Sequence, residues 1–306
     1  MFRGIVLVFL GACSFGILST FVKLAYKEGF TLGEVTGTQV FFGLIVLWVI
    51  VLLRQLLGCK SNSTSFKEKL KLAAMGTSTG LVSIFYYKCV QMVPASIAIL
   101  LLMQFTWMSL LLEAIMKRSA PKLPQLGTVA LILLGTALAG RLFADQLPEF
   151  NWQGIGYGLL AAFCYTIFLT INGAAGNNMH PTTKSATILT GACILIFSVF
   201  PPEFLINGSL GNGLLKWGVG LALFGTVIPP LFYAYGIPKT GLGISAILSA
   251  AELPVAVLMS SLVLKEEVWP VQWIGVLLIL LAIVLSNLQS LRKKKPVSST
   301  GKAAVV

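Results

Sequence analysis

The chain has 306 residues, of which 57% are hydrophobic and only 10% are charged, and its mean hydropathy is +0.90. These values lie far outside the usual soluble range and exclude a water-soluble enzyme or binding domain of this length. The formal net charge of +12 does not indicate nucleic-acid binding, because the Lys and Arg residues cluster in alternate loops and in the C-terminal tail, a pattern that sets membrane topology.

Apolar runs of about 20 residues recur along the chain, and each is long enough to cross a hydrocarbon core about 30 Å thick as a helix. The runs are continuous, whereas a transmembrane β-barrel needs alternating segments of about 10 residues. The sequence therefore predicts an all-α polytopic membrane protein with ten transmembrane helices. In chain order, the predicted spans are 4–26, 33–57, 70–92, 94–116, 124–143, 154–174, 185–200, 213–235, 240–264 and 271–288.

The distribution of basic residues predicts the orientation of these spans. About 16 of the 22 Lys and Arg residues lie at the N-terminus, in the loops after even-numbered spans, or in the tail, with Lys184 and Lys239 counted among them. Since positive charge gathers on the cytoplasmic side, we predict that both termini lie in the cytoplasm and that the protein resides in the cell membrane, the inner or plasma membrane.

The chain resembles itself when it is shifted by about 148 positions. At this offset residues 98–100 (AIL) align with 246–248 (AIL), and Tyr87 aligns with Tyr235. Five spans per repeat is an odd number, so the second repeat must enter the membrane from the opposite side. We predict two inverted five-helix repeats followed by a basic cytoplasmic tail that we expect to be disordered, with boundaries at 1–148, 149–290 and 291–306.

The fourth span of each repeat carries the most specific pattern. In the first repeat it reads VPASIAIL over 93–100; in the second it reads YGIPKTG over 235–241, continues through Glu252 and Pro254, and ends in LKEE over 264–267. Over essentially the whole chain, the sequence resembles the EamA-type permeases of the drug/metabolite transporter superfamily. The resemblance implies a carrier that works by alternating access around a central cavity lined by the first, third and fourth spans of each repeat.

Glu252 is the first candidate for a functional residue, because it lies about a dozen residues into the predicted ninth span, near the middle of the bilayer. An ionisable side chain at that depth costs about 2.5–3.5 kcal/mol on insertion scales and should face a cavity or a partner. It suits a proton-coupling or cation-binding carboxylate; the structural alternative is a protonated or hydrogen-bonded glutamate that ties spans together. Its counterpart at the repeat offset is Gln104, and we expect both to border one central cavity.

Aromatic side chains on the same spans suit amphiphilic organic ligands. We expect Trp107 and Tyr165 to line the cavity, and we include Tyr233 as a candidate. Tyr87 is a further candidate, but it lies near a span end, as Tyr86 and Tyr235 do, so an interfacial aromatic belt is the alternative for these three.

Prolines and charged pairs supply weaker candidates. Pro254 and the pair Pro229-Pro230 each remove a backbone hydrogen bond, which predicts either a hinge or ligand contact or a simple helix distortion. Glu113 and Lys117 have i,i+4 spacing at a span end and are interpreted as surface charge.

The glycine spacing of Gly76 and Gly80 predicts close helix packing. His180 is the only histidine, and the five cysteines show no paired spacing, so no metal site and no cofactor are expected.

These features favour a secondary transporter of small organic metabolites or drugs, and we expect an exporter, coupled to protons through Glu252. An exchanger of phosphorylated sugars or nucleotide sugars is the alternative; it would need Lys or Arg in the cavity, for which Lys239 is the nearest candidate. A membrane-embedded lipid-modifying enzyme is a remote alternative, because the carboxylates are scattered. The expected partners are a small-molecule substrate and the lipid bilayer, and a homodimer is left open.

Overall fold

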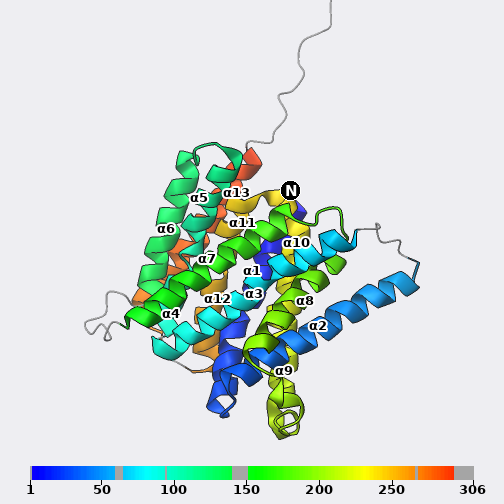
Figure 1. The fold of residues 1–306 in the computed structure, drawn as a ribbon. Helices are drawn as coiled ribbons and strands as arrows, with labels where there is room; N and C mark the ends of the chain where they lie inside the picture. Colours follow the sequence, from blue (N-terminus) through cyan, green and yellow to red (C-terminus); the bar gives the residue numbers. More distant parts are fainter. Residues whose placement is uncertain (1, 59–64, 94, 140–150, 266–267, 293–306) are drawn as a thin grey trace, which may run out of the picture.

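The computed structural model describes residues 2–58, 65–93, 95–139, 151–265 and 268–292, and these residues contain helices and turns but no strands (Figure 1). Three predicted features lie outside the described residues: the junction between the repeats at 148, the acidic end of the family pattern at 266–267, and the tail from 293 onward. The start of α1 and the end of α13 lie at the same end of the helix bundle, which we call the terminal end (Figure 1).

The first repeat forms six helices. Its fourth predicted span is divided, because α4 ends at Leu102 and α5 begins at Phe105. A capping box fixes the start of α2: the Thr31 hydroxyl accepts from the backbone N–H of Glu34, and the Glu34 carboxylate accepts from the N–H of Thr31. The helices are α1 (Phe2–Lys27), α2 (Leu32–Leu56), α3 (Phe66–Met92), α4 (Ala95–Leu102), α5 (Phe105–Lys117) and α6 (Leu123–Ala139).

The second repeat has a similar plan with more irregular helix. Its third predicted span begins at the end of one π-helical segment, η2, and contains a second, η3. Its fourth predicted span is divided between α11 and α12, near the position that corresponds to the α4–α5 division. The elements are α7 (Trp152–Ala174), α8 (Pro181–Val199), η1 (Glu203–Leu205), η2 (Leu210–Leu214), α9 (Leu215–Leu221), η3 (Ala222–Val227), α10 (Ile228–Thr240), α11 (Leu242–Ser249), α12 (Glu252–Val263) and α13 (Pro270–Arg292).

Seven helical segments of the described chain are long and apolar enough to cross a membrane: Phe2–Lys27, Leu32–Leu56, Ile97–Lys117, Trp152–Ala174, Pro181–Val199, Leu210–Thr240 and Leu242–Val263. Two shorter apolar helices, Leu123–Ala139 and Pro270–Leu285, lie beside them. Helix α3 is 27 residues long, but the run Thr77-Ser78-Thr79 lowers its hydropathy. The count of ten spans thus stays a prediction that adds α3 and the two shorter helices to the seven.

Each repeat packs its helices mainly against helices of the other repeat. Helix α3 lies against α7 and α8, α1 against α10 and α12, and α6 against α13. Glycine allows the closest of these approaches: a Cβ atom on Gly191 of α8 would lie 1.7 Å from the Ala73 carbonyl oxygen of α3, and one on Gly76 would lie 2.1 Å from the Ile188 carbonyl oxygen. The predicted packing role of Gly76 is therefore confirmed.

The start of α8 corrects one element of the orientation argument. His180 caps the helix and Pro181 occupies its first turn, so the helix begins before the predicted limit of 185. Lys184 consequently lies inside the fold with 1% exposure, where its Nζ donates to the Asn172 carbonyl oxygen at 2.7 Å and to Asn177 Oδ1 at 3.0 Å. The interpretation of Lys184 as a loop cation is wrong, because the ammonium group caps the C-terminal end of α7.

Candidate substrate site between the repeats

A small cavity with a volume of about 70 Å³ lies between the two repeats. Helices α1, α3 and α4 line it from the first repeat, α7, η3 and α12 line it from the second, and α2 adds Gln39. Apart from α2, these elements belong to the first, third and fourth predicted spans of each repeat. The volume holds a few ordered water molecules but not a metabolite.

Glu252 is the one Asp or Glu among the described residues that line this cavity, and no Lys, Arg or His accompanies it. The break between α11 and α12 places it there, because α11 ends at Ser249 and α12 begins at Glu252 itself. Pro254 lies in the first turn of α12, where the missing N–H is tolerated. Helix α1 approaches this turn closely: a Cβ atom on Gly16 would lie 2.5 Å from the Glu252 carbonyl oxygen.

One buried tyrosine binds the Glu252 carboxylate, and a second, which does not itself line the cavity, contacts the first. The hydroxyl of Tyr165, on α7, donates a hydrogen bond to it, and the hydroxyl of Tyr233, on α10, lies 3.2 Å from that of Tyr165. Oε2 of Glu252 is buried and has no hydrogen-bond partner among the described residues. One carboxylate oxygen is therefore left for a proton, an ion or a ligand group, because a buried polar atom is normally satisfied.

Aromatic rings line the same cavity as the carboxylate. The ring centroids of Phe15, on α1, and Tyr165 lie 5.9 Å apart in an edge-to-face arrangement. Phe168 stacks on Tyr165, with 5.7 Å between the ring centroids. Tyr86 and Tyr87 of α3 complete the wall. The sequence did not indicate Phe15, because α1 is apolar all round and its pattern does not show which face meets the cavity.

A polar layer closes one side of the cavity. The Tyr87 hydroxyl donates to Gln39 Oε1 at 3.1 Å, and the Thr226 hydroxyl donates to the Gln39 carbonyl oxygen at 3.2 Å. The Thr79 hydroxyl oxygen, which also lines the cavity, is buried without a partner among the described residues. Tyr87 thus lies in the protein interior with 4% exposure, so the alternative of an interfacial belt does not apply to it.

Two predicted cavity residues lie elsewhere. The Gln104 amide donates to the Leu100 carbonyl oxygen at 3.0 Å, and its Oε1 accepts from Trp107 Nε1 at 2.9 Å. Neither side chain lines the cavity, and Trp107 is 39% exposed on the outside of the bundle. The expectation that Gln104 and Glu252 border one cavity is therefore not met, because the division between α4 and α5 turns Gln104 back onto its own helix.

The remaining proline and tyrosine candidates lie on α10 and do not line the cavity. Pro229 and Pro230 lie in the first turn of α10, directly after the π-helical segment η3. Tyr235 lies on the same helix, and its hydroxyl is 3.1 Å from His180 Nε2.

His180 joins three helices at one point. Its ring accepts from the Arg54 guanidinium at the end of α2, which also donates to the Thr182 hydroxyl at 3.0 Å. Partial burial, together with the Arg54 charge, lowers the pKa of His180 below its ordinary value of 6.5.

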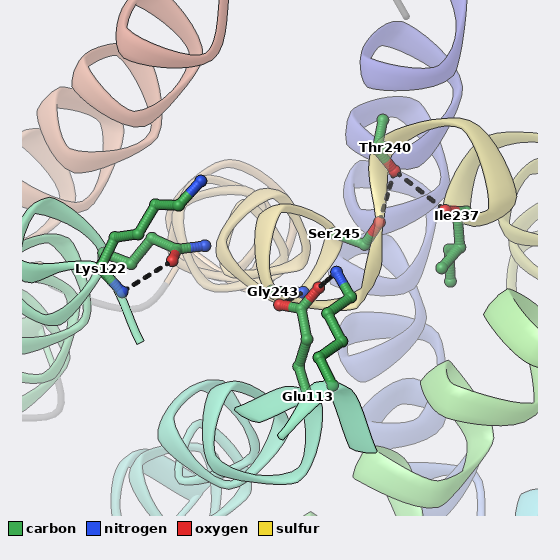
Figure 2. Close-up of polar contacts among 8 residues, drawn as sticks. Glu113, Lys122, Ile237, Thr240, Gly243 and Ser245 are labelled. Atoms are coloured by element: carbon green, nitrogen blue, oxygen red, sulfur yellow. Dashed lines mark hydrogen bonds and ion pairs between the residues drawn. The ribbon is translucent and has the colours of Figure 1, made fainter. Parts of the chain in front are cut away.

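Glu113 joins the two repeats at the terminal end (Figure 2). From α5 it accepts a hydrogen bond from the backbone N–H of Gly243 in the first turn of α11 at 2.7 Å, and Lys117 Nζ lies 2.5 Å from its other oxygen. Only 13% of the Glu113 side chain is exposed, against 62% for Lys117. The interpretation of Glu113 as surface charge is wrong, because its carboxylate binds the second repeat.

Comparison with known proteins places this architecture in a family. The model of the EamA-like transporter family matches residues 2–141 and 152–288, one match in each repeat. Among solved structures 29 chains match significantly, and one of them, a crystal structure described only as that of a protein, has a TM-score of 0.71. That match covers 92% of this chain and 98% of the other at 15% identity, which shows the fold alone. No curated protein matches significantly. The chain therefore belongs to the EamA-like transporter family and is a multi-pass membrane transporter of the drug/metabolite transporter type.

Proposed function

We propose that the protein exports small organic metabolites or drugs by alternating access, with ten spans in two inverted repeats and both termini in the cytoplasm. One observation carries this proposal: the two repeats enclose a cavity in which Glu252 keeps an unpartnered carboxylate oxygen. Polar groups buried in a membrane are costly, so a cavity at this depth with an ionisable side chain indicates a pathway.

The packing supports a closed conformation from which the cavity opens. A metabolite needs several hundred Å³ of space, whereas the cavity has about 70 Å³. The divisions α4–α5 and α11–α12 provide places at which the fourth span of each repeat bends. Both adjoin the cavity, because Leu102 at the end of α4 and Glu252 at the start of α12 line it. Rocking of one repeat against the other about these points would expose the site to each side in turn.

Coupling to protons is assigned to Glu252. Its carboxylate is the one acidic group of the described lining, and Tyr165 and Tyr233 form a hydroxyl chain that leads from it into the packed core. A carboxylate that binds a proton on one side of the membrane and releases it on the other couples export to the proton gradient, which supplies the driving force.

The alternative of a phosphorylated substrate has less support. Phosphate recognition uses Lys or Arg donors, and the described lining contains neither. Lys239, the candidate that the sequence offered, lies at the exposed end of α10.

Transport is tested first by comparing the metabolite profiles of cells with and without the protein, which identifies the exported compound. Purified protein in proteoliposomes should then move this compound under a pH gradient. Glu252→Gln keeps the size of the side chain but cannot exchange a proton, so we expect it to abolish gradient-driven transport. Glu203→Gln, which alters an exposed carboxylate outside the cavity, is the control. Equal transport by wild type and Glu252→Gln would contradict the coupling.

A further inference from the structure

We propose that the cargo of this site is an organic cation, specifically an amine that carries an aromatic or other apolar group. This inference rests on the proposed transport function and names its substrate class. It follows from the charge of the cavity, from its aromatic wall and from the orientation of its free oxygen atoms.

The charge of the cavity favours a cation. Glu252 is the one ionisable acid of the described lining, and no described Lys, Arg or His faces it there. The tyrosines whose electrostatic interactions reach the carboxylate are Tyr86, Tyr87, Tyr165 and Tyr233, and a tyrosine side chain carries no charge at neutral pH. A bound ammonium group would therefore supply the counter-charge that the protein itself does not.

The wall of the cavity favours an apolar group next to that charge. The ring centroids of Phe15 and Phe168 lie 6.4 Å apart, with 76° between the ring planes. The ring centroid of Tyr165 lies within 6 Å of both. Such ring faces attract a cation within about 6 Å of their centroids and also bury the apolar body of a ligand. Aromatic rings beside one carboxylate form the arrangement that recognises ammonium ions.

Both unpartnered polar atoms of the described lining can accept a hydrogen bond: the ionised Glu252 carboxylate only accepts, and the Thr79 hydroxyl accepts as well as donates. Glu252 Oε2 and the Thr79 hydroxyl oxygen are both buried without partners among the described residues. An ammonium group has N–H donors and no acceptor, which matches these atoms.

A carboxylate group on the ligand would find no matching partner in the described lining of the cavity. It would find no described cationic side chain in the lining, and it would add a second negative charge near Glu252. The site should therefore discriminate against zwitterionic and anionic analogues of the same amine.

The cation and the proton then compete for the same carboxylate. Since the ammonium group pairs with the ionised form of Glu252, binding of a cation to the protonated site releases one proton. Affinity for the cation should consequently rise with pH, by about tenfold per pH unit in the range where the carboxylate is mostly protonated.

Three ligands that share a phenyl group test the inference: phenethylamine, phenylalanine and 3-phenylpropionate, which carry a positive, a zwitterionic and a negative charge. Binding to the full-length protein in lipid nanodiscs is measured by titration calorimetry at pH 6 and pH 8, in two buffers of different ionisation enthalpy so that released protons are counted. We expect phenethylamine to bind best, more tightly at pH 8, with net proton release at pH 6.

Two variants and a control assign the binding to this cavity. Glu252→Gln should weaken phenethylamine binding by about 10- to 100-fold, because it removes a charge-assisted contact. Phe15→Leu should weaken it by about 2- to 5-fold. Glu203→Gln should bind as the wild type does. Proton release and pH dependence are measured on the wild type and remain decisive if Glu252→Gln does not fold.

Preferential binding of phenylalanine or 3-phenylpropionate, or phenethylamine binding that is independent of pH and of Glu252, would overturn the assignment. Absence of phenethylamine binding at pH 8 would overturn it as well. None of these results would contradict the transport function, which fails only if cells with and without the protein export the same compounds at the same rates.

Discussion

The side chain of His180 shows how one residue joins the two repeats. Its ring accepts a hydrogen bond from the guanidinium of Arg54 on α2 and lies next to the hydroxyl of Tyr235 on α10. The same ring caps the start of α8. A neutral imidazole can accept from the guanidinium, whereas a protonated ring cannot and would add a second positive charge. The contact therefore depends on the neutral form.

This dependence predicts a loss of stability in acid. The pKa of His180 is lower in the folded protein than its ordinary value of 6.5, so the unfolded chain takes up the proton first. The contribution of the neutral ring is complete above about pH 6.5 and decreases as the pH falls below that value. His180→Asn, which keeps a capping side chain but does not titrate, should show a smaller decrease in Tm between pH 7.5 and pH 5.5. Equal decreases for both proteins in detergent would contradict the argument.

At the scale of residues, the sequence located Glu252 and Tyr165 but not their surroundings. Depth along a span follows from counting residues, so a mid-membrane carboxylate is visible in the sequence. The direction of a side chain around the helix is not, because these helices are apolar on every face. Trp107 was therefore expected in the cavity although it lies on the outside, and Phe15 was missed although it lines the cavity.

The contact between α3 and α8 shows how closely helices from different repeats approach each other. Gly76 and Gly191 each face a backbone carbonyl of the other helix. Close approach of this kind strengthens van der Waals packing, which is the main force between helices in a membrane.

Gly191→Val should force these two helices apart. A Cβ atom there would collide with the Ala73 carbonyl oxygen, and backbone gives way less easily than a side chain, so we expect a loss of about 1–3 kcal/mol of stability. The control is Gly156→Val in α7, where a Cβ atom meets no neighbour within 4 Å. The Tm of both variants, measured in the same detergent, checks the prediction; equal losses would show that helix propensity rather than packing is responsible.

At the scale of elements, helix positions were predictable and helix interruptions were not. Apolar length places the helices, and Pro254 marks one break. The break between α4 and α5 has Thr106 where the second repeat has Pro254, so nothing in its local sequence signals it. The π-helical segment η3 likewise depends on packing against α2, because Thr226 donates to the backbone of Gln39.

The whole molecule is asymmetric although its repeats are similar. Helix α5 packs along α11 at the terminal end, where Glu113 joins them. At the repeat offset this pair corresponds to α12 and α4, which have no comparable contact among the described residues. The fourth spans of the two repeats are thus joined at the terminal end and, in the described part of the chain, not in the same way at the opposite end.

Glu113→Leu should weaken the contact between α5 and α11. The Gly243 N–H would lose its charged acceptor, and we expect amide hydrogen exchange in the first turn of α11 to accelerate by about tenfold. Lys117→Met is the matched control: it removes only the exposed member of the ion pair, so exchange should change little. Mass-spectrometric exchange in nanodiscs measures both, and an unchanged rate in Glu113→Leu would contradict the role of this contact.

The mutual packing of the two repeats also determines how the protein is made. The helices α1 to α6 leave the ribosome before α7, α8, α10 and α12 have been synthesised, although these later helices are the main partners of α1 and α3. During that interval the close-packing surfaces of Gly4 and Gly76, which later meet Gly236 and Ile188, face lipid or chaperone. The main helix contacts of the first repeat can therefore form only after the second repeat has been synthesised.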